Sequence, residues 1–215
     1  MHGRFCVPAS SRQRPAAQAI LNGGVWEPDT IAFVMANAGA GDIVHAGTYF
    51  GDFLPGFSRA VLPGNRVWAF EPNPENFHAA TITRQLNRLD NVEIFNAGLG
   101  DQEAPMKLRV RAEGQAQGGA SRIVEKSRAI PADELVDVSV VRVDDVVPRF
   151  RRVSVLQLDV EGFEQNALTG ALETIAAWRP IVIVETLPEP WVVKNLVPLG
   201  YSATGRLHAN TVLQA

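Results

Sequence analysis

The sequence has almost no cysteine and no long apolar run. Cys6 is the only cysteine among 215 residues, so neither a disulfide framework nor a thiolate metal site can form within one chain. The longest apolar runs, such as 181–184, are far too short to span a bilayer. The first fifteen residues are polar and interrupted by Pro8 and Pro15, so no signal peptide is predicted. These absences predict a cytoplasmic protein without a membrane partner.

The sequence also has no excess of basic residues. It contains 20 Lys and Arg against 23 Asp and Glu, which gives a net charge of −3 and a pI near 5.8. Nucleic acid is therefore not an expected partner. The hydrophobic share of 46% and the charged share of 20% are ordinary for a globular protein, and the length suits one domain with a sizeable core.

Short apolar runs alternate along the chain with segments that have helical patterns. The strand-like runs are 43–46, 67–70, 92–96, 153–158 and 181–184, and the helix-like segments are 27–37, 53–62, 73–89, 163–178 and 191–199. This order predicts an α/β fold with a mostly parallel sheet and helices on both faces. Residues 106–111 and 136–143 alternate apolar and polar side chains, which predicts an antiparallel insertion, and 201–214 predicts a closing hairpin. We expect an N-terminal extension over 1–41 and the main domain over 42–215.

Two glycines follow the first strand, and an acid follows the second. Gly47 and Gly51 flank a turn that contains Thr48, and glycine lets a backbone run close to a ligand. About twenty residues later, Glu71 stands at the tip of the neighbouring strand, where a carboxylate can accept hydrogen bonds from a ribose diol. Asn73 is the expected N-cap of the next helix. The combination predicts a cofactor containing adenosine, although either half could also be a plain structural turn.

Further polar residues are expected at the same edge of the sheet. Asp101 follows Gly100 after the third strand and could accept from an adenine amino group, or form an Asx turn in a surface loop. Asp159 ends a buried strand and Glu161 follows two residues later. These two acids could hold the cofactor's ammonium group, orient a substrate hydroxyl or bind a divalent ion. His208 in the closing hairpin could face the same crevice, or lie exposed in its loop.

No other arrangement of residues predicts a different chemistry. His45, which directly precedes the glycine turn, reads either as a buried core histidine or as a cofactor contact. No His, Cys or Asp group has metal-ligand spacing along the chain, so no dedicated metal site is predicted. No Gly-x-Ser-x-Gly elbow supports a serine nucleophile.

Several of these segments together resemble the FkbM family of S-adenosylmethionine-dependent methyltransferases. The matching segments are Gly47 to Asp52, Phe70 to Phe77, Ala97 to Asp101, Leu158 to Glu164 and Pro180 to Glu185, in the order that the family has. Glu-Pro-Asn-Pro at 71–74 and Asp-Val-Glu-Gly-Phe-Glu at 159–164 are the specific ones. The chain departs from the family at His45, where an acid is usual, and at Thr48-Tyr49, where Ala-Asn is usual.

The resemblance implies a Rossmann-like fold and S-adenosylmethionine as cofactor, with Gly47 beside its methionine part, Glu71 on the ribose and Asp101 near the adenine. It also implies methyl transfer to a hydroxyl oxygen of a sugar or small natural product. The predicted cofactor-binding residues are His45, Gly47, Thr48, Gly51, Glu71, Asn73, Gly100, Asp101 and Asp159. The candidates for the base that removes the hydroxyl proton are Asp159, Glu161 and His208.

Two other functions are compatible with parts of this pattern. A dinucleotide-dependent oxidoreductase would explain Glu71, but the turn from Gly47 to Gly51 lacks the internal glycine that lets a pyrophosphate approach. A non-catalytic protein that binds an adenosine cofactor would explain the missing acid at His45. Residues 24–28, outside the resemblance, could form a lid over the cofactor or a contact in a homo-oligomer.

Overall fold

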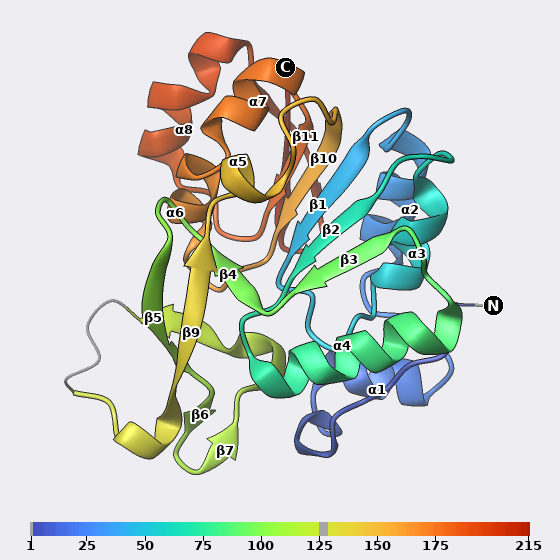
Figure 1. Cartoon of the computed structure of the whole chain (residues 1–215), viewed down its shortest axis with the longest axis vertical. Coiled ribbons are helices and arrows are strands. Elements are labelled where there is room, and N and C mark those ends of the chain that lie inside the picture. Colours follow the sequence, from blue (N-terminus) through green and yellow to red (C-terminus); the bar gives the residue numbers. More distant parts are fainter. Residues whose placement is uncertain (1, 125–128) are drawn as a thin grey trace.

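The computed structural model describes residues 2–124 and 129–215 and centres on a seven-stranded sheet with the order β12-β13-β11-β10-β1-β2-β3 (Figure 1). Its strands are β1 (Asp42–Ala46), β2 (Val67–Phe70), β3 (Val92–Phe95), β10 (Val153–Leu158), β11 (Ile181–Val184), β12 (Ser202–Leu207) and β13 (Asn210–Gln214). The first five of these are parallel, and the hairpin β12–β13 joins antiparallel beside β11. The predicted α/β fold with a mostly parallel sheet is confirmed.

Helices cover both faces of this sheet. One face carries α2 (Pro28–Asn37), α3 (Leu54–Ala60) and α4 (Pro74–Asn87), and the other carries α5 (Val143–Val146), α6 (Glu164–Thr169), α7 (Leu172–Trp178) and α8 (Glu189–Asn195). Successive strand residues point to opposite faces. Ile43 therefore packs with Phe57 of α3, and Val44 packs in the cluster that contains Leu168 of α6. Both faces are apolar, which explains why the strands read as continuous hydrophobic runs.

The segment 163–178 is two helices, where the sequence predicts one. The first helix, α6, ends at Thr169, and the Gly170 that follows lies so close to Gly100 that a Cβ at this position would be 1.9 Å from the Gly100 carbonyl oxygen. The second helix, α7, begins where the Asp144 carboxylate accepts from the backbone N–H groups of Glu173 and Thr174, at 3.0 and 2.9 Å. The predicted helix 191–199 likewise divides into α8 and a 3-10 turn, η4 (Val197–Leu199).

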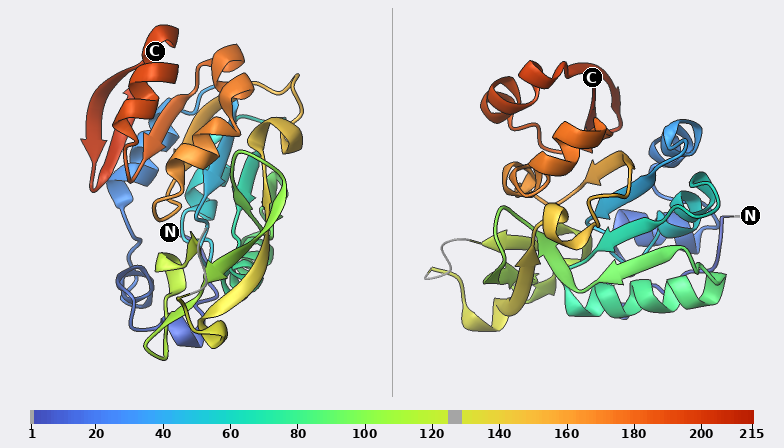
Figure 2. Two further views of the ribbon diagram at one scale, coloured as in Figure 1. Left: turned by 90° about the vertical axis from the view of Figure 1, so that its left-hand side faces the viewer. Right: turned by 45° about the horizontal axis from the view of Figure 1, so that its top comes forward.

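The predicted antiparallel insertion forms a second sheet with the order β4-β9-β5-β8, set beside the central sheet (Figure 2). Its strands are β4 (Ala97–Leu99), β5 (Ala104–Arg109), β8 (Arg122–Val124) and β9 (Leu135–Val141). A small hairpin, β6 (Arg111–Ala112) and β7 (Gln115–Ala116), leads to the short 3-10 turn η2 (Gly118–Ala120). The insertion begins after β3, and its last strand, β9, returns beside β4 before the chain continues into α5 and β10.

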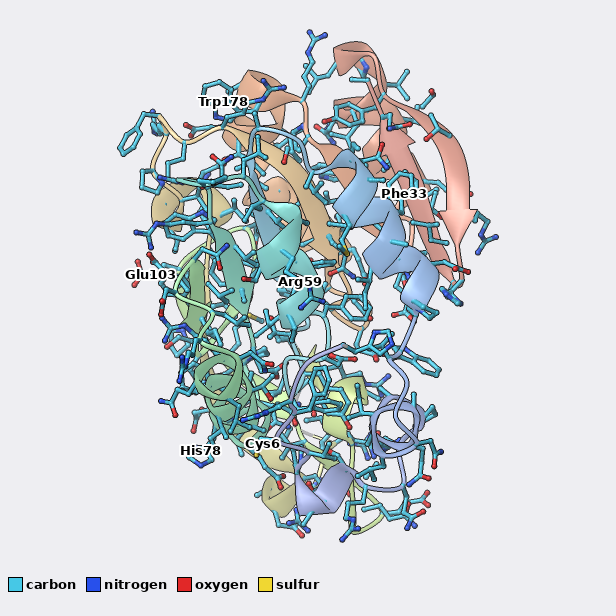
Figure 3. The ribbon with its side chains drawn as sticks, turned by 90° about the vertical axis from the view of Figure 1, so that its right-hand side faces the viewer. Cys6, Phe33, Arg59, His78, Glu103 and Trp178 are labelled. Carbon is cyan, nitrogen blue, oxygen red and sulfur yellow. The ribbon has the colours of Figure 1, made fainter. Side chains whose placement is uncertain are left out.

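The N-terminal extension packs against the main domain. Its first helix, α1 (Pro15–Leu21), is not predicted from the sequence, and Ala17 of that helix packs in a cluster with Tyr49 and Phe50. The segment before it runs along α4 (Figure 3), where the Cys6 N–H donates to the Thr83 hydroxyl at 3.0 Å. Among the described residues, no helix combines the length and the apolarity that a membrane crossing requires.

Candidate functional site

Two cavities lie side by side at the carboxyl ends of the parallel strands. The larger, here the acidic cavity, has a volume of about 290 Å³, and the described residues bring to it the carboxylates of Glu27, Asp52, Asp159, Glu161 and Glu185 and the guanidinium of Arg14. The smaller, here the narrow cavity, has a volume of about 30 Å³ and is lined in part by Glu71, Leu99 and Ile123. Gly47, Gly119 and Asp159 line both. The two cavities therefore meet where β1 and β10 end.

The turn after β1 brings its backbone against β10. Gly47 has a φ of +82°, and a Cβ at this position would lie 1.8 Å from the Asp159 carbonyl oxygen. The N–H groups of Gly47 and Thr48 both donate to the Phe70 carbonyl, at 3.1 and 3.2 Å. Only glycine fits this close approach. The absence of a side chain at Gly47 thus lets the ends of β1 and β10 lie close together at the boundary between the cavities.

Glu71 extends from the end of β2 into the narrow cavity and is 4% exposed. Its carboxylate accepts from the backbone N–H groups of Tyr49 at 2.7 Å and Asn73 at 2.9 Å, and from the Asn76 amide at 3.4 Å. A carboxylate has about four acceptor positions, so these three donors leave about one for a ligand. Burial raises the pKa of Glu71 to about 7. Glu71 therefore fixes the glycine turn and still faces a cavity.

Asn73 caps α4 and anchors the loop that covers both cavities. Its side-chain oxygen accepts from the Glu75 N–H at 3.0 Å, and its amide donates to the Ser121 hydroxyl at 3.0 Å. Asn76 donates to the Gly118 carbonyl at 3.1 Å. The ring of Tyr49 packs beneath the same loop, 3.3 Å from the position of a Cβ on Gly119. The loop 118–121 is thus fastened to the main sheet from both sides.

Asn73→Ala is expected to reduce the free energy of unfolding by about 1 kcal/mol, because it removes the N-cap of α4. Urea denaturation measures this loss. Asn73→Ser is the matched control, since serine also caps helices, and its stability should lie close to that of the wild type. Equal losses in the two variants would contradict the capping role.

Three carboxylates converge on one side of the acidic cavity. Asp159 follows β10, Glu161 lies in the next turn with a φ of +54°, and Glu185 follows β11. One oxygen of each lies within 4.8 Å of the others. Burial and then the charges of Glu185 and Glu161 raise the pKa of Asp159 well above its usual value. Burial and then the charge of Glu185 raise the pKa of Glu161.

His45 forms part of the wall of the same cavity and is 2% exposed. Its Nδ1 is hydrogen-bonded to the side-chain oxygen of Gln157 in β10, and its ring stacks on Phe53 at 5.7 Å and meets the edge of Phe57 at 5.1 Å. Its Nε2 has no partner among the described residues. Burial lowers the pKa of His45 to about 4, so the ring is neutral near pH 7.

The structure brings some of the predicted site residues together and leaves others outside both cavities. His45, Gly47, Glu71, Asp159 and Glu161 line one cavity or both, and Thr48, Gly51, Asn73, Gly100, Asp101 and His208 line neither. Thr48 and Asn73 act through hydrogen bonds to the turn and the loop. No ligand is present, so each predicted contact stays a prediction.

The other predicted residues outside the cavities have local contacts. Gly51 has a φ of +85°, and a Cβ there would lie 2.9 Å from Leu54. A Cβ on Gly100 would lie 2.5 Å from Val140. Asp101 is exposed and accepts from Asn166 at 3.4 Å, and His208 lies 3.9 Å from the Asp29 carboxylate.

Sequence reasoning reaches some of the remaining residues of the acidic cavity and misses others. Glu185 ends a buried strand, as Asp159 does, so the sequence places it at the same edge of the sheet. Trp26 lies in the segment 24–28, for which the sequence predicts either a lid over the cofactor or an oligomer contact. Arg14 and Gly119 are missed, because their positions depend on how distant segments fold back over the sheet.

Comparison with known proteins identifies a family over most of the chain. The model of the methyltransferase FkbM domain matches residues 39–196. A curated relative, "Methyltransferase 1" from Beauveria bassiana, is 29% identical over 145 residues, which are 60% of this chain. Those residues span 57% of the relative's own length.

The solved structures support the same fold. A methyltransferase FkbM from Methylobacillus flagellatus superposes with a TM-score of 0.52 and 17% sequence identity. The match covers 81% of this chain and 43% of the solved chain. At this level of sequence identity, the structural similarity supports the Rossmann-like fold and nothing more specific.

Proposed function

Because this chain belongs to the FkbM methyltransferase family, we propose that it transfers a methyl group from S-adenosylmethionine to a hydroxyl oxygen of a sugar or small natural product. The observation that carries this proposal is the junction of the two cavities at Gly47 and Asp159. A cofactor that lies across this junction has its adenosine on the side of Glu71. Its methyl group then faces the acidic cavity.

The narrow cavity supports the position of the adenosine but is too small for it as it stands. At about 30 Å³ it is far below the several hundred Å³ of typical ligand sites. Gly119, Ser121 and Ile123 form its outer wall. We expect this loop to move outward when the cofactor binds, with loss of the hydrogen bonds from Asn73 to Ser121 and from Asn76 to Gly118, because the opposite wall belongs to the rigid sheet. Glu71 then accepts from the ribose.

The acidic cavity supports the position of the acceptor. Arg14, Trp26 and Glu27 of the N-terminal extension close one side of it, which favours the lid interpretation of this segment. Trp26 is 40% exposed, so its ring is available to a ligand. A hydroxyl acceptor here meets carboxylates that can take its hydrogen bond.

The proposed reaction is an in-line transfer. The bond between the cofactor's sulfur and the methyl carbon breaks as the bond from the acceptor oxygen to that carbon forms, so the protein must align the two reactants. The hydroxyl proton passes to a base. Asp159 lines both cavities, whereas His208 lines neither, and this favours Asp159 over His208. The raised pKa of Asp159 suits a proton acceptor near neutral pH.

Calorimetry tests the cofactor, and label transfer tests the reaction. The protein should bind S-adenosylmethionine and S-adenosylhomocysteine and should not bind NAD. Incubation with S-adenosylmethionine labelled in its methyl group should then label a panel of hydroxyl-bearing sugars and natural products. The proposal would be refuted if the protein bound NAD and bound neither S-adenosylmethionine nor S-adenosylhomocysteine.

Glu71→Gln is expected to weaken cofactor binding by about ten- to a hundredfold, since a charge-assisted hydrogen bond contributes roughly 1.5–3 kcal/mol. Calorimetry on the folded variant measures this change. The control is Glu75→Gln, which changes an exposed acid in the first turn of α4 and should bind the cofactor as the wild type does. An unchanged dissociation constant in Glu71→Gln would remove Glu71 from the cofactor site.

A further inference from the structure

The acidic cavity holds more negative charge than the described residues neutralise. One oxygen from each of Asp159, Glu161 and Glu185 lies within 4.8 Å of the others. None of the three takes part in an ion pair with a Lys or Arg of the described residues. Like charges at this separation raise each other's energy unless a cation or a proton lies between them. The arrangement therefore favours a bound cation.

His45 points independently to a ligand in the same cavity. Phe53 and Phe57 pack around its ring, Nδ1 is hydrogen-bonded to Gln157, and the residue lines the acidic cavity, so Nε2 is its one ring nitrogen without a partner among the described residues. This nitrogen is buried without a partner, which costs free energy unless a ligand supplies a donor. With Nδ1–H donating to Gln157, Nε2 is an acceptor. A water molecule bound to a metal ion is a donor that suits it.

We propose that Asp159, Glu161 and Glu185 bind a divalent cation such as Mg²⁺ or Mn²⁺, with His45 Nε2 accepting from a water molecule on that ion. Carboxylate oxygens are the ligands that these ions prefer, and Mg²⁺ commonly keeps several waters. The three acids come from the ends of two adjacent strands and one turn, so the sheet holds two of them in place.

The cation's part in the reaction rests on the proposed methyl transfer. The acceptor oxygen binds the ion, which lowers the pKa of the hydroxyl. The hydroxyl proton passes to the Asp159 oxygen that is not bound to the ion. The acceptor oxygen then forms its bond to the methyl carbon as the carbon–sulfur bond breaks, and the cofactor leaves as the neutral thioether. The ion also holds the acceptor in line with the methyl group.

Terbium luminescence tests the site directly, without cofactor. Tb³⁺ also prefers oxygen ligands, and Trp26 lines the same cavity, so an ion bound there should emit when tryptophan is excited. Mg²⁺ and Mn²⁺ should displace it and quench the emission. Trp26→Phe should lose most of the sensitised emission while calorimetry shows that Tb³⁺ still binds.

Two single substitutions locate the ion. Glu161→Gln and Glu185→Gln should each weaken Tb³⁺ binding by at least about tenfold, because each removes a charged ligand. Glu189→Gln, at an exposed acid four residues beyond Glu185, should bind as the wild type does. Circular dichroism checks that each variant is folded. Absence of Tb³⁺ binding, or equal binding in all three variants, would overturn the proposal.

The same proteins separate this proposal from the proposed function. Methyl transfer should rise when Mg²⁺ or Mn²⁺ is added and fall with EDTA, and calorimetry with S-adenosylmethionine should succeed with or without the ion. Transfer that is indifferent to both additions would overturn the cation's role and leave the methyltransferase standing. The opposite outcome is also distinguishable. If the wild type binds terbium, Glu161→Gln and Glu185→Gln lose it, and no cofactor binds, the ion site is supported and the proposed function is refuted.

Discussion

Asp159→Asn is expected to lower the single-turnover rate of methyl transfer by roughly 10²–10⁴-fold, while cofactor affinity stays within a few-fold. Asparagine keeps the shape of the side chain but cannot accept the hydroxyl proton. Among the residues that the structure describes, Asp159 is the one carboxylate that lines both cavities, so it can reach the acceptor at the point where the methyl group is presented. Single-turnover kinetics and calorimetry on the same preparation measure both quantities.

The pH dependence of the rate provides a second test of whether Asp159 is the base. A base acts in its deprotonated form, and burial with the neighbouring Glu185 and Glu161 charges raises the pKa of Asp159. Without added divalent cation, the wild-type rate should therefore increase with pH through that raised pKa, and Asp159→Asn should lack this rise. A cation bound to the three carboxylates would lower the pKa of Asp159 and move the rise to lower pH. The rate rises and does not fall with pH, because a protonated Asp159 cannot accept the hydroxyl proton.

Controls separate the role of Asp159 from other effects. Asp145→Asn changes an exposed carboxylate on α5, outside both cavities, and should retain the wild-type rate. A large loss of cofactor affinity in Asp159→Asn, with little change in the single-turnover rate, would mean that this acid holds the cofactor's ammonium group instead. Full rate and normal affinity in both Asp159→Asn and Glu161→Gln would leave the segment 159–164 with a purely structural role.

Gly47→Ala is expected to destabilise the protein by at least about 3 kcal/mol and to abolish cofactor binding. Two causes act together: the residue has a φ of +82°, and the added Cβ would lie 1.8 Å from the Asp159 carbonyl oxygen. Relief of this collision must push the ends of β1 and β10 apart. The substitution therefore affects the fold as well as the cofactor site.

Gly64→Ala is the matched control for this substitution. Gly64 has a similar φ of +90°, but no atom of the described residues other than its chain neighbours lies within 4 Å of the added Cβ. The control therefore measures the cost of the backbone conformation alone, roughly 1 kcal/mol or slightly more. Guanidinium denaturation of both variants separates the two causes. Equal losses of stability would show that the contact with Asp159 is unimportant.

The sequence predicts the central sheet well because its strands are buried on both faces. Runs such as Val67–Phe70 and Ile181–Val184 are apolar throughout, and the structure has strands with these same bounds. Local patterns fail where a distant backbone sets the conformation. The helix predicted over 163–178 is interrupted at Gly170, which packs against Gly100, and α7 begins where the distant Asp144 carboxylate caps it. Both partners lie outside the segment, so its own pattern does not reveal them.

The candidate site divides in the same way. Gly47, Glu71 and Asp159 follow buried strands, so their place at the ligand edge follows from the strand order. Glu185 also follows a buried strand, and the pairing of β11 with β10 brings it beside Asp159. The roles of Trp26 and Gly119 depend on segments that fold back over the edge from the extension and the insertion. Such contacts carry no periodic signal in the sequence.

A crystal structure with S-adenosylhomocysteine tests the central claim most directly. The account predicts the sulfur beside Gly47 at the junction of the two cavities, the ribose within hydrogen-bonding distance of Glu71, and an open space in the acidic cavity next to the sulfur. The loop 118–121 should lie further from the sheet than it does here. An adenosine on the acidic side, or a ligand bound away from Gly47, would contradict the account.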